Sequence, residues 1–171
     1  MQHLIPEFEN ARILVAGDLM LDRYWSGPAS RVSPEAPVPV VHITDARERP
    51  GGAGNVALNV TALGAKCSLL AVVGHDEPAR TVKEQLAQGN VQCELIDHPE
   101  FKTITKLRIL SQHQQLIRLD FEEPDTDLCD GLLPTQFMSL LNVHDLVVLS
   151  DYGKGTLSEV HALISMCRDL G

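Results

Sequence analysis

The hydrophobic positions of the chain change repeatedly between a strand-like and a helix-like period. Short, nearly continuous apolar runs that stop at Gly or Ser predict buried parallel strands over residues 12–17, 66–74 and 145–150. Between these runs, apolar residues recur at helical spacing and predict helices over residues 53–63, 77–89 and 157–170. Strands that alternate with helices are typical of an α/β protein with a mainly parallel sheet.

The ends of the predicted helices carry local signals. Gly64 suits a left-handed cap after the first helix, and Thr156 and Glu159 have capping-box spacing at the start of the last one. The apolar stripe of that last helix, which includes Leu170, needs a further strand to cover. We therefore expect residues 1–171 to be the N-terminal part of one longer α/β domain, with a compact small domain as the alternative.

Some stretches with strand propensity fall outside this alternation. They are residues 37–43 and the pair 103–110 and 116–121. Because they do not follow the parallel rhythm, they predict a small accessory antiparallel sheet. The turn at 111–115 lacks the Asn-Gly signal of a tight hairpin, so the register of the last pair stays open.

Composition and charge restrict the classes of partner. The chain has 23 acidic and 14 basic residues, a net charge of −9, and a normal share of hydrophobic residues, 44%. This balance offers no broad cationic surface, which argues against nucleic acid and anionic membranes as partners. No apolar run approaches the roughly 20 residues of a membrane-spanning helix. Residues 1–10 do not resemble a secretory signal, so we expect a cytoplasmic protein.

The cysteines and histidines do not suggest a metal site. Cys67, Cys93, Cys129 and Cys167 are widely spaced and form no C-x-x-C pair. The histidines show neither H-x-H nor H-E-x-x-H spacing. We expect the cysteines to be reduced thiols of the core.

The sharpest local feature is the segment RPGGAGNVALN at residues 49–59, which we expect to run from a loop into a helix. Gly51 and Gly52 leave backbone amides at a helix start open to a ligand hydroxyl or anion, and the Asn55 amide suits a sugar hydroxyl. The alternative is a flexible turn that enters a packed helix. The dinucleotide fingerprint G-x-G-x-x-G is not matched.

Carboxylates follow two of the predicted strands. Asp18 comes directly after the first strand, where ligands bind in open α/β sheets, and Asp22 lies four residues further on. Asp151 directly follows the strand at 145–150, and Lys154 lies three residues further on. Asp18 is therefore a candidate for holding sugar hydroxyls, and the alternative is that it caps the turn.

Residues 101–119 contain four basic side chains and no acidic one. Strand alternation would put Lys106 and Arg108 on one face, where charge-assisted hydrogen bonds can hold a phosphate. A solvated edge strand protected by lysines explains the same charges.

Taken together, these segments resemble the ribokinase-like (PfkB) family of sugar kinases. Its N-terminal signature is matched by Gly51, Gly52, Asn55, Ala57, Gly64 and Gly74. Within the family, the similarity is strongest to kinases of heptose 7-phosphate in lipopolysaccharide synthesis, in particular the kinase half of bifunctional kinase/adenylyltransferases. It is carried by GDLMLDRYW at 17–25, SRVSPEAPVPV at 30–40, RPGGAGNVALN at 49–59, TKLRILSQHQQLIRLDFEE at 105–123 and LSDYGKG at 149–155.

The resemblance implies transfer of a phosphoryl group from ATP, with Mg²⁺, to the C1 hydroxyl of the sugar phosphate. It places Asp18, Gly51, Gly52 and Asn55 in the sugar pocket. It assigns the 7-phosphate to Arg31, Lys106, Arg108 and Arg118, adds Asp22 and Asp120 to the substrate-binding set, and puts Asp151 and Lys154 near the phosphates. The accessory sheet, over about 24–45 and 101–123, becomes a lid and the contact of a homodimer.

The resemblance also implies that part of the machinery is absent. The family's catalytic base is the Asp of a D-T-x-G-A-G-D motif, which these 171 residues do not contain. Asn55 follows the similar Gly52-Ala53-Gly54, and an amide cannot accept the proton. We therefore expect the base to lie beyond Gly171, and no residue of this chain is assigned as catalytic.

Without that base, we expect the chain alone to hold most of the sugar pocket and the lid but to be inactive. The alternatives are another PfkB kinase, for a pentose or fructose phosphate, and a non-catalytic sugar-phosphate-binding or dimerisation module.

Overall fold

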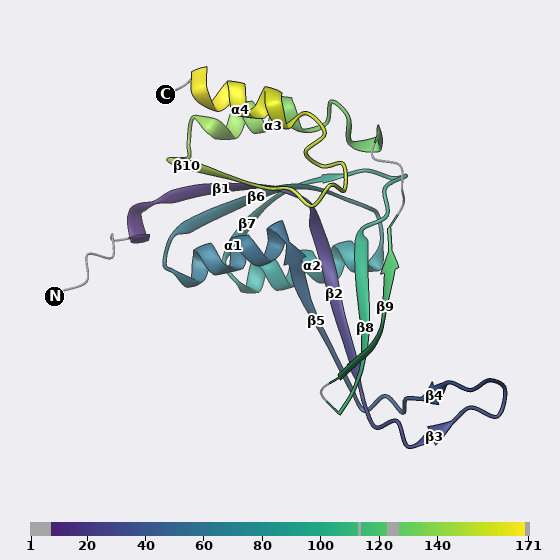
Figure 1. Ribbon diagram of the computed structural model, residues 1–171. Coiled ribbons are helices and arrows are strands. Elements are labelled where there is room, and N and C mark those ends of the chain that lie inside the picture. Colours follow the sequence, from purple (N-terminus) through teal and green to yellow (C-terminus); the bar gives the residue numbers. More distant parts are fainter. Residues whose placement is uncertain (1–7, 113, 123–126, 170–171) are drawn as a thin grey trace.

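The computed structural model describes residues 8–112, 114–122 and 127–169, in which the chain forms two larger sheets and passes repeatedly from one to the other (Figure 1). The core sheet has the order β10-β1-β6-β7, with β1 at Arg12–Gly17, β6 at Lys66–Val73, β7 at Val91–Asp97 and β10 at Leu146–Ser150. The accessory sheet has the order β5-β2-β8-β9, with β2 at Leu19–Ser26, β5 at Asp45–Gly52, β8 at Ile104–Ser111 and β9 at Gln114–Phe121.

Helices cover both faces of the core sheet (Figure 1). On one side lie α1 (Ala53–Ala62) and α2 (Glu77–Gln88), and on the other lie α3 (Leu133–Leu141) and α4 (Val160–Asp169). The shorter elements are the 3-10 turns Phe8–Asn10 and Asp127–Cys129 and the ribbon of β3 (Arg31–Val32) and β4 (Pro39–Val40).

Alternation along the strands divides the core between these two helical layers. Val15 and Leu69 pack in the cluster that contains α1 and α2, whereas their neighbours Leu14 and Leu70 pack in the cluster that contains α3 and α4. All pairs in the sheet are parallel. A parallel sheet buried on both faces needs near-continuous apolar strands, which explains why the predictions for β1, β6 and β10 are confirmed within one residue.

The accessory sheet leaves the core sheet at the carboxyl ends of its strands, because only Asp18 separates β1 from β2. Its outer pairs, β2 with β5 and β8 with β9, are antiparallel, and the central pair β2 with β8 is parallel. Arg23 of β2 donates to Glu48 of β5 at 2.6 Å and also pairs with Glu77 at the start of α2. These ion pairs fix the sheet against the helical layer.

The accessory sheet is larger than the pattern predicts. Strands β8 and β9 confirm the pair 103–110 and 116–121, but of 37–43 only Pro39–Val40 is a strand. Residues 19–26 and 45–52, which were not predicted as strands, form β2 and β5 and extend the sheet beyond 24–45 and 101–123. The sequence DARERPGG of β5 has low strand propensity, so its pairing with β2 overrides the local preference.

The prediction of a capping box before the last helix is wrong. Helix α4 begins at Val160 rather than at 157, because the Thr156 amide donates to Asp18 Oδ1 at 3.1 Å and the Glu159 carboxylate accepts from the Gly131 amide at 3.0 Å. The apolar patterns of β7 and α3 were not interpreted as elements.

The last two positions of the sequence lie outside the described residues. They are Leu170, the end of the predicted apolar stripe, and Gly171, beyond which the catalytic base is expected. Both expectations therefore stay predictions.

The cysteines are all free, and Cys67 and Cys129 are buried, as expected for core thiols. Burial raises the pKa of both thiols to about 11, which keeps them protonated and unreactive. In the described part of the chain, no helix is long and apolar enough to cross a membrane.

A two-part contact joins the start of β1 to the turn before β10. The Arg12 guanidinium donates to Asp145 Oδ1 at 2.7 Å and to Oδ2 at 3.2 Å, and the Arg12 amide donates to Oδ2 at 2.9 Å. These bonds, the side-chain bond foremost, lower the pKa of Asp145 to about 2. Folding therefore favours the ionised form of the Asp145 carboxylate.

We expect the contribution of this contact to depend on pH. Because the pKa of Asp145 is lower in the folded chain than in the unfolded chain, stability is gained above about pH 4 and is lost as the pH falls toward about 2. Asp145→Asn should lower the urea midpoint near neutral pH, and the difference from the unmodified chain should vanish near the acid limit. A matched control is Asp130→Asn, since Asp130 is exposed and has no ion pair within the described residues. An unchanged difference at both pH values would contradict the assignment.

The junction between β5 and α1 requires glycine at position 52. Gly52 has φ 57° and ψ −130°, a conformation that L side chains rarely adopt. A Cβ atom there would lie 2.2 Å from the Asp18 carbonyl oxygen, and the next amide, of Ala53, donates to that oxygen at 2.9 Å. The glycine thus lets the end of β5 touch the crossing from β1 to β2.

Gly52→Ala should therefore destabilise the fold more than a substitution at an open glycine. Gly64→Ala is the matched control, because Gly64 also has a positive φ, 96°, but its nearest neighbour would be 3.9 Å away. Overpacking costs about 1–3 kcal/mol, and we expect Gly52→Ala to exceed the control by that amount in urea unfolding. Equal losses for the two variants would mean that the contact with Asp18 imposes no constraint.

Candidate functional site

Asp18 lies at the carboxyl end of the core sheet and is fully buried, at 0% exposure. Its Oδ2 accepts hydrogen bonds from the amides of Tyr152 at 2.7 Å and Lys154 at 3.1 Å, and its Oδ1 accepts one from Thr156 at 3.1 Å. The loop after β10 therefore wraps around one carboxylate, and charge-assisted bonds of this kind are about twice as strong as neutral ones.

The sequence of this loop explains why alternate amides reach the same side chain. Gly153 and Gly155 have φ values of 65° and 96°, which reverse the backbone between the donating residues. The structure thus gives Asp18 the role of a cap for the loop, the alternative considered for it from the sequence. Its carboxylate oxygens face the loop and not the solvent.

The segment Gly51–Asn55 adjoins Asp18 directly. A Cβ atom at Gly51 would lie 2.6 Å from Asp22 Oδ2 and 2.9 Å from Met20 Cγ, so this glycine makes room for strand β2. Asn55 is exposed on the first turn of α1 and makes no side-chain hydrogen bond with a described residue. The bond from Ala53 to the Asp18 carbonyl oxygen joins the two segments into one continuous site.

The register of the accessory sheet gathers charged residues on one face. Arg49, Asp22, Lys106 and Asp120 form one row across β5, β2, β8 and β9. The next row consists of Arg47, Tyr24, Arg108 and Arg118. Residues two apart on a strand share a face, so the two rows make a single polar face.

The cations predicted to hold a phosphate are mostly paired within this face. Arg108 donates to Asp22 Oδ1 at 2.5 Å, Lys106 contacts Asp120 at 3.1 Å, and Arg118 donates to Asp120 at 2.8 Å. The structure therefore brings these five residues together. Their charges are largely neutralised before any ligand binds.

An ion-pair chain connects the polar face to the Asp18 loop. Glu122, just after β9, accepts from Lys154 at 2.7 Å and from Lys106 at 3.4 Å. The hydrogen bond from Lys154 is the main cause that lowers the pKa of Glu122. Lys154 thus ties the loop to the sheet, and the exposed Asp151 accepts only from the Gly153 amide, at 2.8 Å, among the described residues.

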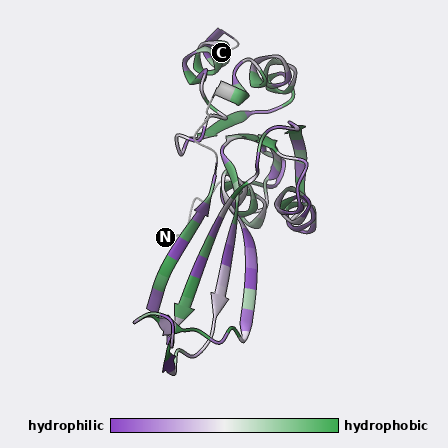
Figure 2. Ribbon diagram, turned by 90° about the vertical axis from the view of Figure 1, so that its right-hand side faces the viewer, coloured by the Kyte–Doolittle hydropathy of each residue, from purple (hydrophilic) through white to green (hydrophobic). Residues whose placement is uncertain are grey.

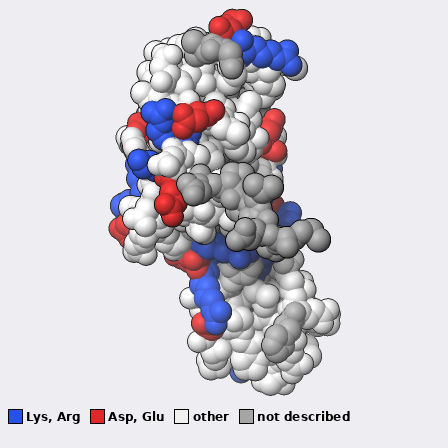
Figure 3. Space-filling model, turned by 90° about the vertical axis from the view of Figure 1, so that its left-hand side faces the viewer, with Lys and Arg blue, Asp and Glu red and all other residues white. Residues whose placement is uncertain are grey.

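Arg31 does not join this cluster. It is exposed on β3, in the ribbon at the far end of the accessory sheet (Figure 1). Figure 3 shows basic and acidic side chains next to each other at several places on one side of the molecule.

The residues that sequence reasoning missed are Tyr24, Arg49 and Glu122. Tyr24 and Arg49 lie in segments that were quoted only for other residues, and Glu122 directly follows the predicted strand 116–121. One signal in the sequence could have found Tyr24. Side chains alternate between the two faces along β2, so Tyr24 lies on the same face of the sheet as Asp22. This signal was not used because neither segment was predicted as a strand.

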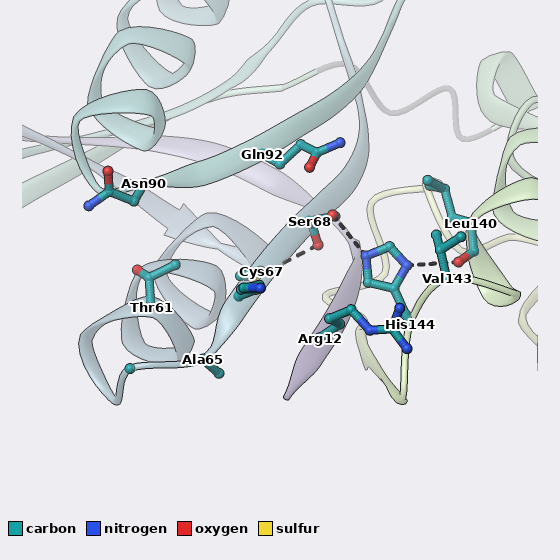
Figure 4. Close-up of a pocket in the computed structure, with 12 residues that line it drawn as sticks. Arg12, Thr61, Ala65, Cys67, Ser68, Asn90, Gln92, Leu140, Val143 and His144 are labelled. Carbon is teal, nitrogen blue, oxygen red and sulfur yellow. Dashed lines mark hydrogen bonds between the residues drawn. The ribbon is translucent and has the colours of Figure 1, made fainter. Parts of the chain in front are cut away.

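A separate pocket of about 610 Å³ lies at the amino ends of the core strands, away from Asp18 (Figure 4). His144 lies in it between Ser68 of β6 and the carbonyl oxygen of Leu140 at the end of α3, with nitrogen to oxygen distances of 2.8 and 2.7 Å. Since a carbonyl can only accept, Nδ1 carries the proton toward Leu140, and Nε2 accepts from the Ser68 hydroxyl in the neutral ring.

This serine and histidine pair does not form a catalytic centre. Strand β6 is hydrogen-bonded on both sides, to β1 and β7, so the amides beside Ser68 are committed to the sheet and cannot stabilise an oxyanion. Helices α1 and α3 end at this pocket, where Arg12 and Lys66 offset their negative ends. Its polar groups stabilise the fold.

The sequence pattern of the pfkB family of carbohydrate kinases matches residues 10–164 of the chain. The bifunctional protein HldE of Nitrosococcus oceani is 51% identical over 171 residues, and that of Aeromonas hydrophila is 52% identical. Both matches cover 100% of this chain and 36% of the relative. The chain thus spans 36% of the length of these curated relatives, and the position of a catalytic base beyond Gly171 stays a prediction.

Solved structures of kinases share the fold. Phosphofructokinase-2 from Escherichia coli in complex with fructose-6-phosphate matches with a TM-score of 0.69 and 19% identity, over 94% of this chain and 52% of that chain. A carbohydrate kinase from Agrobacterium tumefaciens matches with a TM-score of 0.64 and 22% identity, over 81% and 45%. The ribokinase-like α/β fold expected from the sequence is confirmed. From the match over most of its length, the chain belongs to the pfkB family of carbohydrate kinases.

Proposed function

We propose that this chain forms the sugar-binding part of an ATP-dependent kinase that phosphorylates heptose 7-phosphate at C1. The observation that carries the proposal is the continuity of the site: the polar face of the accessory sheet starts directly beside Asp18 and the first turn of α1. Ligands of open α/β sheets bind at this end of the strands. Membership of a carbohydrate kinase family and about 50% identity to HldE proteins support it.

The side chains divide the substrate between them in this proposal. Asn55 is exposed and unbonded within the described chain, and its amide can donate to one sugar hydroxyl and accept from another. Asp22, held by Arg108 beside Gly51, is an acceptor for a further hydroxyl. Asp18 holds the loop of Asp151 and Lys154 in place, and so fixes the wall that faces the sugar.

ATP is the phosphoryl donor in this proposal, and Lys154 is the nearest cation on the Asp18 loop for its phosphates. The Lys154 ammonium is bound to Glu122 and would have to leave it. Mg²⁺ would arrive with the nucleotide, since it is held mainly by substrate phosphates, water and one or two carboxylates, and within the described residues no three His, Cys, Asp or Glu side chains converge on one point. No step is therefore assigned to the metal here.

Calorimetric titration tests the proposal. We expect the chain to bind heptose 7-phosphate, and Asn55→Ala to weaken that binding about tenfold, because it leaves a sugar hydroxyl without its partner. Asn59→Ala is the matched control, since Asn59 is exposed on the same helix one turn further on. In a coupled assay the chain should show no sugar-dependent ATP hydrolysis.

The outcomes separate the rival functions. Fructose 6-phosphate bound more tightly than heptose 7-phosphate would favour another kinase of the family. Binding of neither sugar phosphate would refute a sugar-binding role, and sugar-dependent ATP hydrolysis would show that a base within these 171 residues suffices.

We further propose that the opposite face of the accessory sheet pairs two copies of the chain. Trp25, Ile117, Leu119 and Phe121 lie on this face and are between 37% and 56% exposed. Figure 2 shows hydrophobic and hydrophilic residues alternating along these strands. An apolar area of this kind, on a sheet whose other face is charged, suits a second copy.

Introducing a charge into this face should separate the copies. We expect a dimer for the unmodified chain and a monomer for Ile117→Lys, measured by light scattering during size-exclusion chromatography. Val143→Lys is the matched control, because Val143 is equally exposed, 50%, but lies far from the accessory sheet. A monomeric unmodified chain, or a dimer that survives Ile117→Lys, would contradict this assembly.

A further inference from the structure

Two guanidinium groups lie against one aromatic ring on the polar face. The Cζ atom of Arg49 is 4.8 Å from the centre of the Tyr24 ring, and that of Arg108 is 5.1 Å from it. Arg49 also donates to the Tyr24 hydroxyl at 2.5 Å. Cation and ring contacts at these distances hold the side chains in place. The two like charges are therefore kept close to each other by the fold.

The charges of this cluster do not balance. Arg108 is paired with Asp22, and although partial burial opposes it, the bond to Asp22 raises the pKa of Arg108. Arg49 has no carboxylate partner among the described residues, since its contacts are the ring and the hydroxyl of Tyr24. One positive charge is thus left over beside a neutral ion pair.

Each of the other cations on the polar face has a carboxylate partner. Lys106 contacts both Asp120 and Glu122, Arg118 is bound to Asp120, and Arg47 pairs with Asp45 at 2.8 Å. An anion that approached one of them would have to displace a carboxylate. Arg49 can accept an anion without losing any such bond.

The space beside Arg49 is large enough for a ligand group. A cavity of about 740 Å³ is lined by Tyr24, Arg49, Ser26 and Thr44, among others. Two carboxylates, Asp45 and Glu48, also line it, and each already has a cation partner, Arg47 and Arg23 respectively. A guanidinium presents parallel N–H donors that match a phosphate, and its fixed plane reduces the entropy lost on binding. The hydroxyls of this lining can complete the shell of the anion.

We propose that Arg49, held by Tyr24 and assisted by Arg108, binds the terminal phosphate of the sugar phosphate and sets the preference for a phosphorylated substrate. The inference rests on the proposed function for its sugar, and it replaces Lys106, Arg118 and Arg31 as the principal phosphate contacts. Arg49 lies in the same row as Asp22, two residues along β5 from Gly51, so the subsite continues from the sugar site along the strand.

The test compares three ligands, heptose, heptose 7-phosphate and inorganic phosphate, by calorimetry at constant ionic strength. Arg49→Gln should weaken the binding of heptose 7-phosphate and of inorganic phosphate about tenfold or more. The affinity for neutral heptose should stay nearly unchanged. Arg49→Lys should restore only part of the affinity, because a lysine keeps the positive charge but lacks the two parallel N–H donors of the guanidinium. Arg47→Gln removes a charge from the lining of the same cavity, but Asp45 already pairs with that charge, so we expect a loss of affinity below about threefold.

Each result bears on one claim. If the unmodified chain binds heptose 7-phosphate and Arg49→Gln does not change that affinity, the subsite is refuted while the proposed function stands. If inorganic phosphate binding depends on Arg49 but heptose 7-phosphate binds no better than heptose, the anion site stands and the proposed substrate falls. Equal losses of affinity for Arg47→Gln and Arg49→Gln would also overturn the subsite. They would show that phosphate binding depends on the overall positive charge of this face and not on Arg49. Circular dichroism of the variants excludes unfolding as the cause.

Discussion

The structure depends on the set of bonds around Asp18. Its carboxylate holds the loop after β10, its carbonyl oxygen accepts from the first amide of α1, and its own amide donates to Ser150. A buried carboxylate is costly unless its oxygens are bonded, and three amides meet that requirement here. One residue therefore connects both sheets, a helix start and a loop.

Asp18 is also the single residue between β1 and β2, which belong to different sheets. Because β2 begins one residue after β1 ends, the direction of the accessory sheet is determined by the core sheet. The pairing of Arg23 with Glu48 and Glu77 fixes the other side of the sheet against α2. The polar face is thereby presented to the carboxyl end of the core strands, where ligands of open α/β sheets bind.

The elements that could be predicted from the sequence are those with a local residue pattern. The elements and contacts that were missed depend on which strands pair with each other. The apolar runs of β1 and β6 are buried on both faces, and these runs and the partly buried run of β10 could be identified directly. Strand β5 could not, since it is polar and is held in place by β2. The contact between Tyr24 and Arg49 depends on the register of those two strands, so no local signal places the residues together. The role of Asp18 in capping the loop was open because its partners lie more than 130 residues away.

The accessory sheet has a further consequence for how such proteins can diverge. Its four strands are each eight residues long, and their side chains point alternately to a charged and to an apolar surface. Substitutions at every second position can alter one surface and leave the other intact. Ligand preference and subunit contacts can therefore evolve separately on a single layer of backbone, provided that no insertion shifts a strand by one residue and exchanges its two sides.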